Sequence, residues 1–311
     1  MPFYNLLVLC RFRNRLNFIT RGKPQMSYPR MIFLTSLAMI AFAGNSLLCR
    51  AALKHAGIDA ASFTSIRLIS GAIMLWMLVN LGRGYKIGRG NWLSAFALFV
   101  YAAGFSYAYV SLPASTGALL LFGAVQATMI GHGIRTGERL LKLQIMGLVI
   151  ALAGLVGLLL PGLSAPPMLG SVLMLASGIA WGVYSLRGKG AGDPLRVTAG
   201  NFMRAVPFAA ALSVVMAGRS SLDSAGFCYA LASGALTSGV GYSVWYTVLP
   251  ALKAAKAATV QLSVPVIAAL GGVLLLGEPI TVRLLLSSLA ILGGIALVIL
   301  EKQRTGGAGR G

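Results

Sequence analysis

The chain has 311 residues, of which 57% are hydrophobic and 10% are charged, and its mean hydropathy is +0.82. A soluble protein of this length needs far more polar surface, so the composition excludes a soluble fold and indicates an integral membrane protein. The net charge of +20 comes from basic residues that lie mostly between the apolar runs. In that position they indicate membrane topology and contact with anionic lipid, and not a nucleic-acid-binding surface.

Residues 1–30 form a basic N-terminal segment ahead of the first long apolar run. Its own apolar stretch is too short to span a bilayer, and Arg11 to Arg15 follow that stretch on the wrong side for a signal peptide. Met26 and Met31 are alternative starts, so the segment is either a tail or an upstream extension of the gene. We assign it no function.

Eight long runs carry no charge, or a single arginine, and these predict the membrane spans. As one helix, the run 90–134 would be about 68 Å long, twice a bilayer core, so it must fold back, and Leu112-Pro113 offers the turn. The run 143–186 breaks at residues 161–167, PGLSAPP, where three prolines and a glycine stop a helix. We therefore expect ten membrane-spanning helices and no sheet. The runs are 31–49, 60–82, 90–134, 143–186, 197–218, 224–252, 257–277 and 284–300.

Basic residues alternate between the two sides of these ten spans. With the N-terminus in the cytoplasm, most of the 26 lysines and arginines fall in cytoplasmic tails and loops. Arg50, Lys54, Arg219 and Arg283 then face outward. This positive-inside pattern predicts a multi-pass protein of the inner membrane with both termini cytoplasmic, residues 301–311 forming the C-terminal tail.

The two halves of the chain resemble each other. Because each half holds five spans, the second half must enter the membrane in the opposite orientation. We therefore expect two inverted repeats, residues 31–160 and 169–300, with a substrate site near the midplane between them, a common plan of secondary transporters. The matched pairs, at an offset of 137 residues or 140 for the glutamates, are Gly104–Gly241, Ser106–Ser243, Tyr109–Tyr246, Leu112–Leu249, Pro113–Pro250, Ala114–Ala251, Arg50–Arg187, Arg67–Arg204 and Glu138–Glu278.

Three stretches resemble EamA domains of the drug/metabolite transporter superfamily. Residues 41–76 are similar to the start of a first EamA domain. The end of that domain is resembled by GALLLFGAVQATMI (117–130) together with GERL (137–140). Residues 257–300 are similar to a second EamA domain. The resemblance covers about 31–300. It implies ten helices in two EamA repeats, a cytoplasmic-membrane location, and transport, often export, of metabolites or drugs. It says little about the substrate.

Two arginines lie inside predicted spans. Arg67 is eight residues from the outer end of its span and Arg204 eight residues from the inner end of its own, which places them at similar depths from opposite faces. A buried arginine usually faces a bundle interior or an aqueous cavity. Each arginine either reaches the interface or a loop carbonyl, or lines the route and attracts a substrate anion with its fork of donors.

The six acidic residues all fall at or beyond predicted helix ends, so we expect no carboxylate deep in a span. Small multidrug exporters of the superfamily bind proton and cationic drug through a buried glutamate in the first helix, and the first span here has none. We therefore predict an anionic or zwitterionic substrate such as an amino acid, with multidrug efflux as the alternative. Glu138 and Glu278 follow glycines at the ends of the fourth and ninth spans, where each either caps the next helix or serves as a gate or proton relay.

Further polar and aromatic residues are candidates for the cavity wall, although helix packing and interfacial anchoring are the alternatives. We also expect two prolines, Pro207 and Pro265, to bend their helices. The candidate substrate-binding residues are Asn45, Gln126, Gln261, Trp181 and Tyr184, together with the two arginines.

The sequence thus predicts a secondary carrier that exports its substrate by alternating access. A membrane-embedded enzyme would need a cluster of Asp, His or Cys, which the sequence does not offer, so we expect no catalytic residue, metal or cofactor. No GxxxxGK[ST] motif for ATP is present. A pore is the remaining alternative, and the sequence leaves the oligomeric state open.

Overall fold

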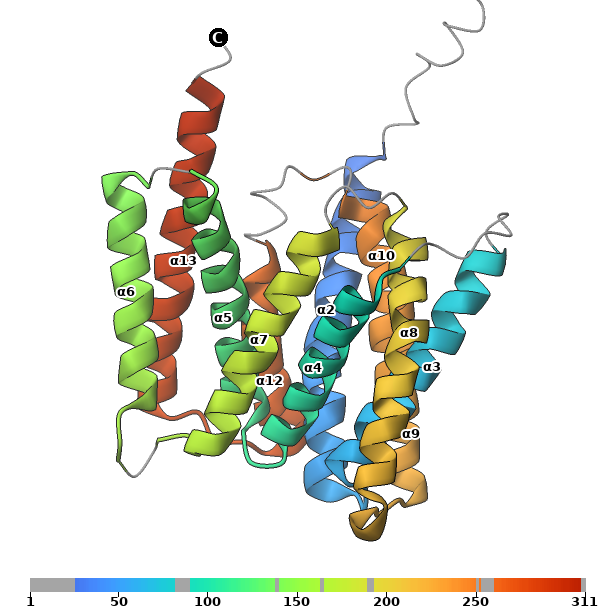
Figure 1. Cartoon of the computed structure of the whole chain (residues 1–311). Helices are drawn as coiled ribbons and strands as arrows, with labels where there is room; N and C mark the ends of the chain where they lie inside the picture. Colours follow the sequence, from blue (N-terminus) through green and yellow to red (C-terminus); the bar gives the residue numbers. More distant parts are fainter. Residues whose placement is uncertain are drawn as a thin grey trace, which may run out of the picture.

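The computed structural model describes residues 26–81, 90–137, 140–162, 165–188, 193–249, 252 and 260–308, and these residues are helical with no strand among them (Figure 1). The predicted all-helical class is therefore confirmed for the described chain. The elements are α2 (Tyr28–His55), α3 (Ala60–Leu81), α4 (Trp92–Tyr109), α5 (Ala114–Arg135), α6 (Lys142–Leu159), α7 (Met168–Gly188), α8 (Pro194–Val215), η1 (Ala217–Arg219), α9 (Ser224–Ala232), η2 (Ser233–Val240), α10 (Gly241–Val248), α12 (Ser263–Leu276) and α13 (Val282–Ala308).

Each of the ten predicted spans coincides with a helix or a helical stretch. The eighth is the continuous stretch α9–η2–α10, in which η2 is a π-helix. Of the described helices, seven are long and apolar enough to cross a membrane, namely α2 to α7 and α13. The apolar helix α12 has only 14 described residues. The count of ten crossings therefore stays a prediction.

The predicted turns fall where the sequence places them. The fold-back inside 90–134 is confirmed, because α4 ends at Tyr109 and α5 begins at Ala114 with Pro113 as its N-cap. After α6, Gly162 has a φ of 148° that few other residues adopt. Gly277 ends α12 in the left-handed conformation, with a φ of 61° and its N–H bonded to the carbonyl of Gly272.

Helix neighbours come in pairs that are related by exchanging the two halves. Helices α4 and α7 pack together, and so do their counterparts, the α9–η2–α10 stretch and α2. Likewise α5 packs on α7, and their counterparts α12 and α2 pack together. In three further packed pairs, exchanging the two halves turns the pair into itself; these are α3–α8, α5–α12 and α6–α13. This pattern supports a two-fold relation between the repeats, and an odd number of helices per repeat would make it an inverted one.

The first described helix begins, and the last one ends, at the same face of the molecule. Figure 1 shows the start of α2 and the end of α13 at the top of the view, which we call the upper face. The end of α2 and the start of α5 lie at the opposite, lower face. An even number of crossings gives this arrangement. The prediction that the upper face is cytoplasmic remains to be tested.

Helices α6 and α13 approach so closely that only small residues fit between them. A β-carbon on Gly294 would meet the backbone of Gly147, and one on Gly154 would meet Ala290. Large apolar side chains on the same helices, such as Leu152 and Leu289, are exposed. In a bilayer the small residues pack the helix pair while the large ones face lipid.

Candidate substrate-binding cavity

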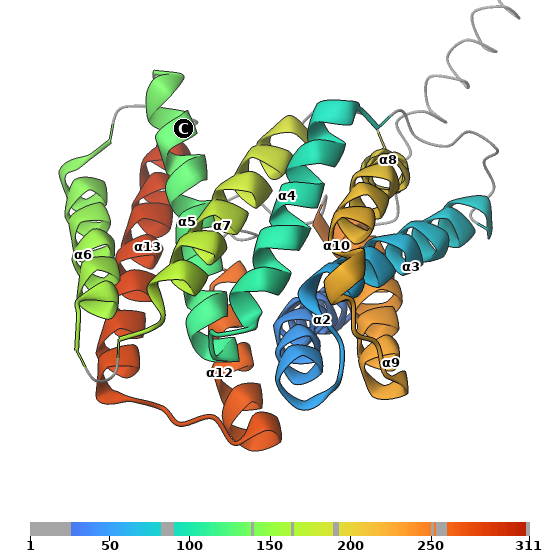
Figure 2. The ribbon, with the colours of Figure 1, turned by 60° about the horizontal axis from the view of Figure 1, so that its bottom comes forward.

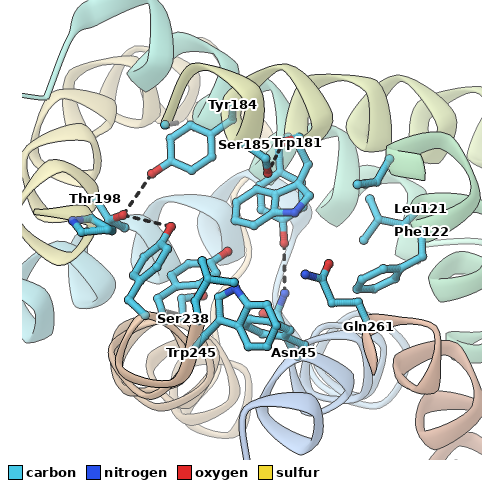
Figure 3. Close-up of a pocket in the computed structure, with 18 of the residues that line it drawn as sticks. Asn45, Leu121, Phe122, Trp181, Tyr184, Ser185, Thr198, Ser238, Trp245 and Gln261 are labelled. Carbon is cyan, nitrogen blue, oxygen red and sulfur yellow. Dashed lines mark hydrogen bonds between the residues drawn. The ribbon is translucent and has the colours of Figure 1, made fainter. Parts of the chain in front are cut away.

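A cavity of about 480 Å³ lies between helices of both halves. Its walls come from α2, α4, α5, α7, α8, η2 and α10, together with Gln261 just before α12, and Figure 3 shows part of the lining. The last residue of α7, Gly188, and the first of α8, Pro194, also line it, so the cavity extends to the upper face. Its volume suits a small metabolite.

Five of the seven predicted substrate-binding residues line this cavity, which therefore gathers residues from α2, α5, α7 and the stretch just before α12. Figure 3 shows Tyr184 at one end and Asn45 with Gln261 at the other. The gathering supports the prediction that these residues bind substrate, but binding itself stays a prediction. The five are Asn45, Gln126, Trp181, Tyr184 and Gln261.

Nine aromatic residues line the cavity. The indole of Trp181 stacks on Tyr242, with ring centroids 5.4 Å apart, and on Tyr184 at 5.2 Å. The ring of Tyr101 lies 4.8 Å from the same indole. Such a wall offers flat apolar surface and electron-rich faces that attract cationic groups.

One end of the cavity carries linked hydroxyl and amide groups. The hydroxyl of Tyr184 donates to Thr198 at 3.4 Å and accepts from the Asn201 side-chain amide at 3.4 Å. Thr198 in turn donates to the hydroxyl of Tyr246 at 3.3 Å (Figure 3). These neutral groups can exchange partners with a bound polar solute at small cost.

The π-helix η2 supplies a second polar cluster, around Asn45. The side-chain oxygen of Asn45 accepts from Ser233 at 2.7 Å and from Thr237 at 3.3 Å, and its amide donates to Tyr101 at 3.3 Å. A π-helix often marks a functional site because the wider turn re-aims side chains. The sequence analysis missed this element, SGALTSGV (233–240), because its apolar character fits an α-helical span equally well.

Arg67 is buried one side chain behind the cavity wall, with 1% of its surface exposed. Its Nη2 donates to the Tyr101 hydroxyl at 2.9 Å, and its Nε donates to Ser238 at 3.5 Å. Its Cζ lies 5.1 Å and 4.9 Å from the ring centroids of Tyr101 and Phe105. Its Nη1 has no hydrogen-bond partner among the described residues. Tyr101, Phe105 and Ser238 all line the cavity, so Arg67 is separated from the cavity only by side chains that it contacts.

Arg204, the repeat counterpart of Arg67, lies in a different environment. It is half-buried, its Nη1 donates to the Gly200 carbonyl of its own helix at 3.0 Å, and it does not line the cavity. Equivalent positions in the repeats therefore do not carry equivalent chemistry. Its predicted role in substrate binding stays a prediction that this geometry does not favour.

One expected contact of a charged residue is wrong. Glu278 lies just beyond the end of α12, as predicted, but it is buried, 5% exposed, and accepts from Arg50 Nε at 3.0 Å and from the amide of Ala114 at 2.8 Å. It caps α5 and not the helix that follows it. Arg50, which the topology prediction places on the outer side of the membrane, is buried within the bundle, where its Nη1 also donates to the carbonyls of Tyr109 and Val110. The side of the membrane on which it lies stays a prediction. Local sequence could not show either contact, since the partners lie far apart in the chain.

The remaining predicted residues are three. Pro207 lies inside α8, and Pro265 lies in the first turn of α12, where a proline costs no hydrogen bond within the helix. The bends expected at both stay predictions. Glu138 lies outside the described residues.

Known proteins resemble this chain over nearly its whole helical part. The chain is 61% identical to "Uncharacterized protein PA1977" of Pseudomonas aeruginosa over 271 residues, 87% of this chain and 94% of that protein. It is 25% identical to "Uncharacterized transporter YoaV" of Bacillus subtilis over 75% of this chain and 85% of that one. A protein of known crystal structure, 18% identical, shares the fold with a TM-score of 0.64 over 90% of this chain and 99% of its own. Residues 29–160 and 168–300 each match the EamA-like transporter family, and the chain therefore belongs to this family of the drug/metabolite transporter superfamily.

Proposed function

We propose that this transporter is a secondary carrier that exports a small anionic or zwitterionic metabolite, such as an amino acid, across the inner membrane by alternating access. The observation that carries the proposal is Arg67, a buried guanidinium whose Nη1 bonds to none of the described residues and which lies beside a cavity of metabolite size. The aromatic and neutral polar wall supplies the remaining surface of the site.

The balance of buried charge favours an anionic group in the cavity. The buried charged side chains of the described chain are Arg50, Arg67 and Glu278. Arg50 and Glu278 neutralise each other in an ion pair, so Arg67 has no acid partner within the part of the chain that the structure describes. In a low-dielectric interior one uncompensated charge sets the sign of the local field and attracts the opposite charge.

The cavity wall also accommodates the positive end of a zwitterion. The stacked faces of Trp181 and Tyr242 attract an ammonium group, and the amides of Gln126 and Gln261 offer carbonyl oxygens to it. A cationic drug would meet the same aromatic faces but would be repelled by Arg67. Multidrug efflux is therefore the second candidate, and the aromatic wall is the observation in its favour.

The test is transport by purified protein in liposomes. The probes are a panel of radiolabelled neutral and acidic L-amino acids and the lipophilic cation tetraphenylphosphonium. We expect at least one amino acid to show saturable uptake with counterflow, which a pore does not show. Arg67→Gln should lower this flux about tenfold or more, the size of one lost interaction with a charged group.

Arg204→Gln is the matched control, because it removes a guanidinium that does not line the cavity. It should leave flux within about twofold. Size-exclusion chromatography checks that both variants stay folded. Transport of tetraphenylphosphonium alone, or amino-acid transport equally sensitive to both substitutions, contradicts the proposed site.

A further inference from the structure

The cavity is closed at its lower end by a buried polar cluster. Four elements meet there: the ends of α2 and α4, the start of α5, and the residue that follows Gly277 at the end of α12. Figure 2 brings this face forward and shows the end of α12 beside the end of α2 and the start of α5. The upper end differs, because the cavity reaches the helix ends there.

An ion pair bonded to backbone groups holds these four elements together. The Arg50 and Glu278 side chains join at 3.0 Å with only 11% and 4% of their surfaces exposed. Arg50 Nη1 donates to Tyr109 O at 2.9 Å, and Glu278 Oε2 accepts from Ala114 N at 2.8 Å. Glu278 belongs to the second half, whereas Arg50, Tyr109 and Ala114 belong to the first. The two bonds of Glu278, to Arg50 and to Ala114, therefore cross between the repeats.

The repeat counterpart of Arg50 is not bonded in this way. Arg187 occupies the same repeat position at the upper face but is exposed. It donates to Ser94 at 3.2 Å and Asn91 at 3.4 Å, both at the start of α4. Arg50 is thus buried in the protein interior, whereas its counterpart Arg187 is exposed.

We propose that Arg50 and Glu278 form a latch that keeps the lower, periplasmic side of the pathway shut, and that the described conformation is the one in which the substrate cavity communicates with the cytoplasmic side. The inference rests on the proposed carrier function, since only a carrier must open this seal in each cycle. A buried ion pair suits the task because its attraction is largely offset by desolvation. Opening exchanges each partner for water instead of exposing an apolar core.

A native thiol reports on the latch. Cys49 precedes Arg50 on α2 and is fully buried. Only Cys10 and Cys228 need replacement by serine to make it the single cysteine of the chain. A membrane-impermeant maleimide can then reach Cys49 from outside only when the lower face opens.

The experiment compares the rate of Cys49 labelling in spheroplasts and in everted vesicles. Glu278→Gln removes the charge but keeps an oxygen for the Ala114 amide. We expect it to raise the rate in spheroplasts about tenfold, equivalent to about 1.4 kcal/mol of lost preference for the closed state. Asp223→Asn, which removes the exposed N-cap carboxylate of α9 at the same face, is the control and should not change the rate.

Labelling does not require the substrate to be known. The experiment can therefore contradict the latch while the transport assay supports the proposed function, or support the latch while the transport assay fails. If Glu278→Gln is not monodisperse, Glu278→Asp, which keeps the charge but shortens its reach, is judged by the same criterion. An unchanged rate in the folded variant overturns the latch. An increase seen only in everted vesicles overturns the assignment of the lower face to the periplasm.

Discussion

Replacing Tyr101 with phenylalanine removes one oxygen atom that two buried donors share. That oxygen accepts from Arg67 Nη2 at 2.9 Å and from Asn45 Nδ2 at 3.3 Å. The ring remains, so its positions 5.1 Å from the Arg67 Cζ and 4.8 Å from the Trp181 ring are preserved. The substitution therefore asks how much the hydroxyl alone contributes to holding a guanidinium inside the bundle.

The expected cost follows from the groups left without a partner. Nη2 would join Nη1 as a second buried N–H group of Arg67 lacking an acceptor, and a hydrogen bond to a charged group is worth about 1.5–3 kcal/mol. The longer bond to Asn45 adds roughly 0.5–1 kcal/mol. Tyr101→Phe should therefore lower the free energy of unfolding by about 2–4 kcal/mol. Tyr246→Phe, whose hydroxyl has a neutral partner at 3.3 Å, should cost only about 0.5–1 kcal/mol.

A double-mutant cycle separates the arginine contribution. Unfolding of the purified protein in mixed micelles is followed by denaturant titration for Tyr101→Phe, Arg67→Met and the double variant. We expect a coupling energy of about 1.5–3 kcal/mol, because Tyr101→Phe costs little once the guanidinium is gone. Equal costs of Tyr101→Phe in the two backgrounds would refute the view that this hydroxyl stabilises Arg67.

Three further predictions concern packing, pH and the second repeat. A β-carbon on Gly294 would strike the Gly147 backbone, so Gly294→Ala should lower the melting temperature, whereas Gly131→Ala, with open space around it, should not. For Asp59, in the α2–α3 loop, burial raises the pKa, but hydrogen bonds from Ser62 and the amides of Ser221 and Ala61 outweigh it and hold the pKa below its ordinary value. A lowered pKa means stability that is present above the ordinary value, about 3.9, and lost as pH falls through the lowered one, so Asp59→Ala should be destabilised at pH 7 but converge with the parent in acid. Finally, Arg187→Gln should slow Cys49 labelling, the opposite of Glu278→Gln, because the repeat relation gives Arg187 the task of closing the upper face when the lower one opens; faster labelling contradicts this.

The helices were predictable because two local features define them: the number of apolar residues needed to span a bilayer, and the prolines and glycines that end a helix. Pro113 and the 161–167 segment end helices through their own backbone restrictions, whatever they pack against. The cavity was predictable in part for a related reason. Asn45, Gln126 and Gln261 are polar in spans that otherwise face lipid or apolar side chains, so burial inside the bundle was the low-energy place for them.

Contacts between distant segments were not predictable in the same way. Glu278 and Arg50 are 228 residues apart, and each resembles a loop residue when only its neighbours in sequence are considered. The π-helix η2 differs from an α-helix in having hydrogen bonds between residues five apart instead of four, and the hydrophobic pattern of the sequence does not reveal this difference. Both features depend on which helices become neighbours, and that is decided by the packing of the whole bundle.

The comparison of repeat positions explains why a symmetric sequence pattern gives an asymmetric site. The pairs Arg67–Arg204 and Arg50–Arg187 match at one offset, yet in each pair the first-half member is buried and the second-half member is not. A backbone two-fold places equivalent residues at equivalent depths, but burial also depends on which face of the bundle is shut. For Arg50 and Arg187, the proposed exchange of open and closed faces would exchange their environments, and on that proposal their difference belongs to the conformation. For Arg67 and Arg204 the partners differ in kind, an aromatic hydroxyl against a carbonyl of the same helix. That difference would persist in either conformation, and it places the positive charge of the site in the first repeat.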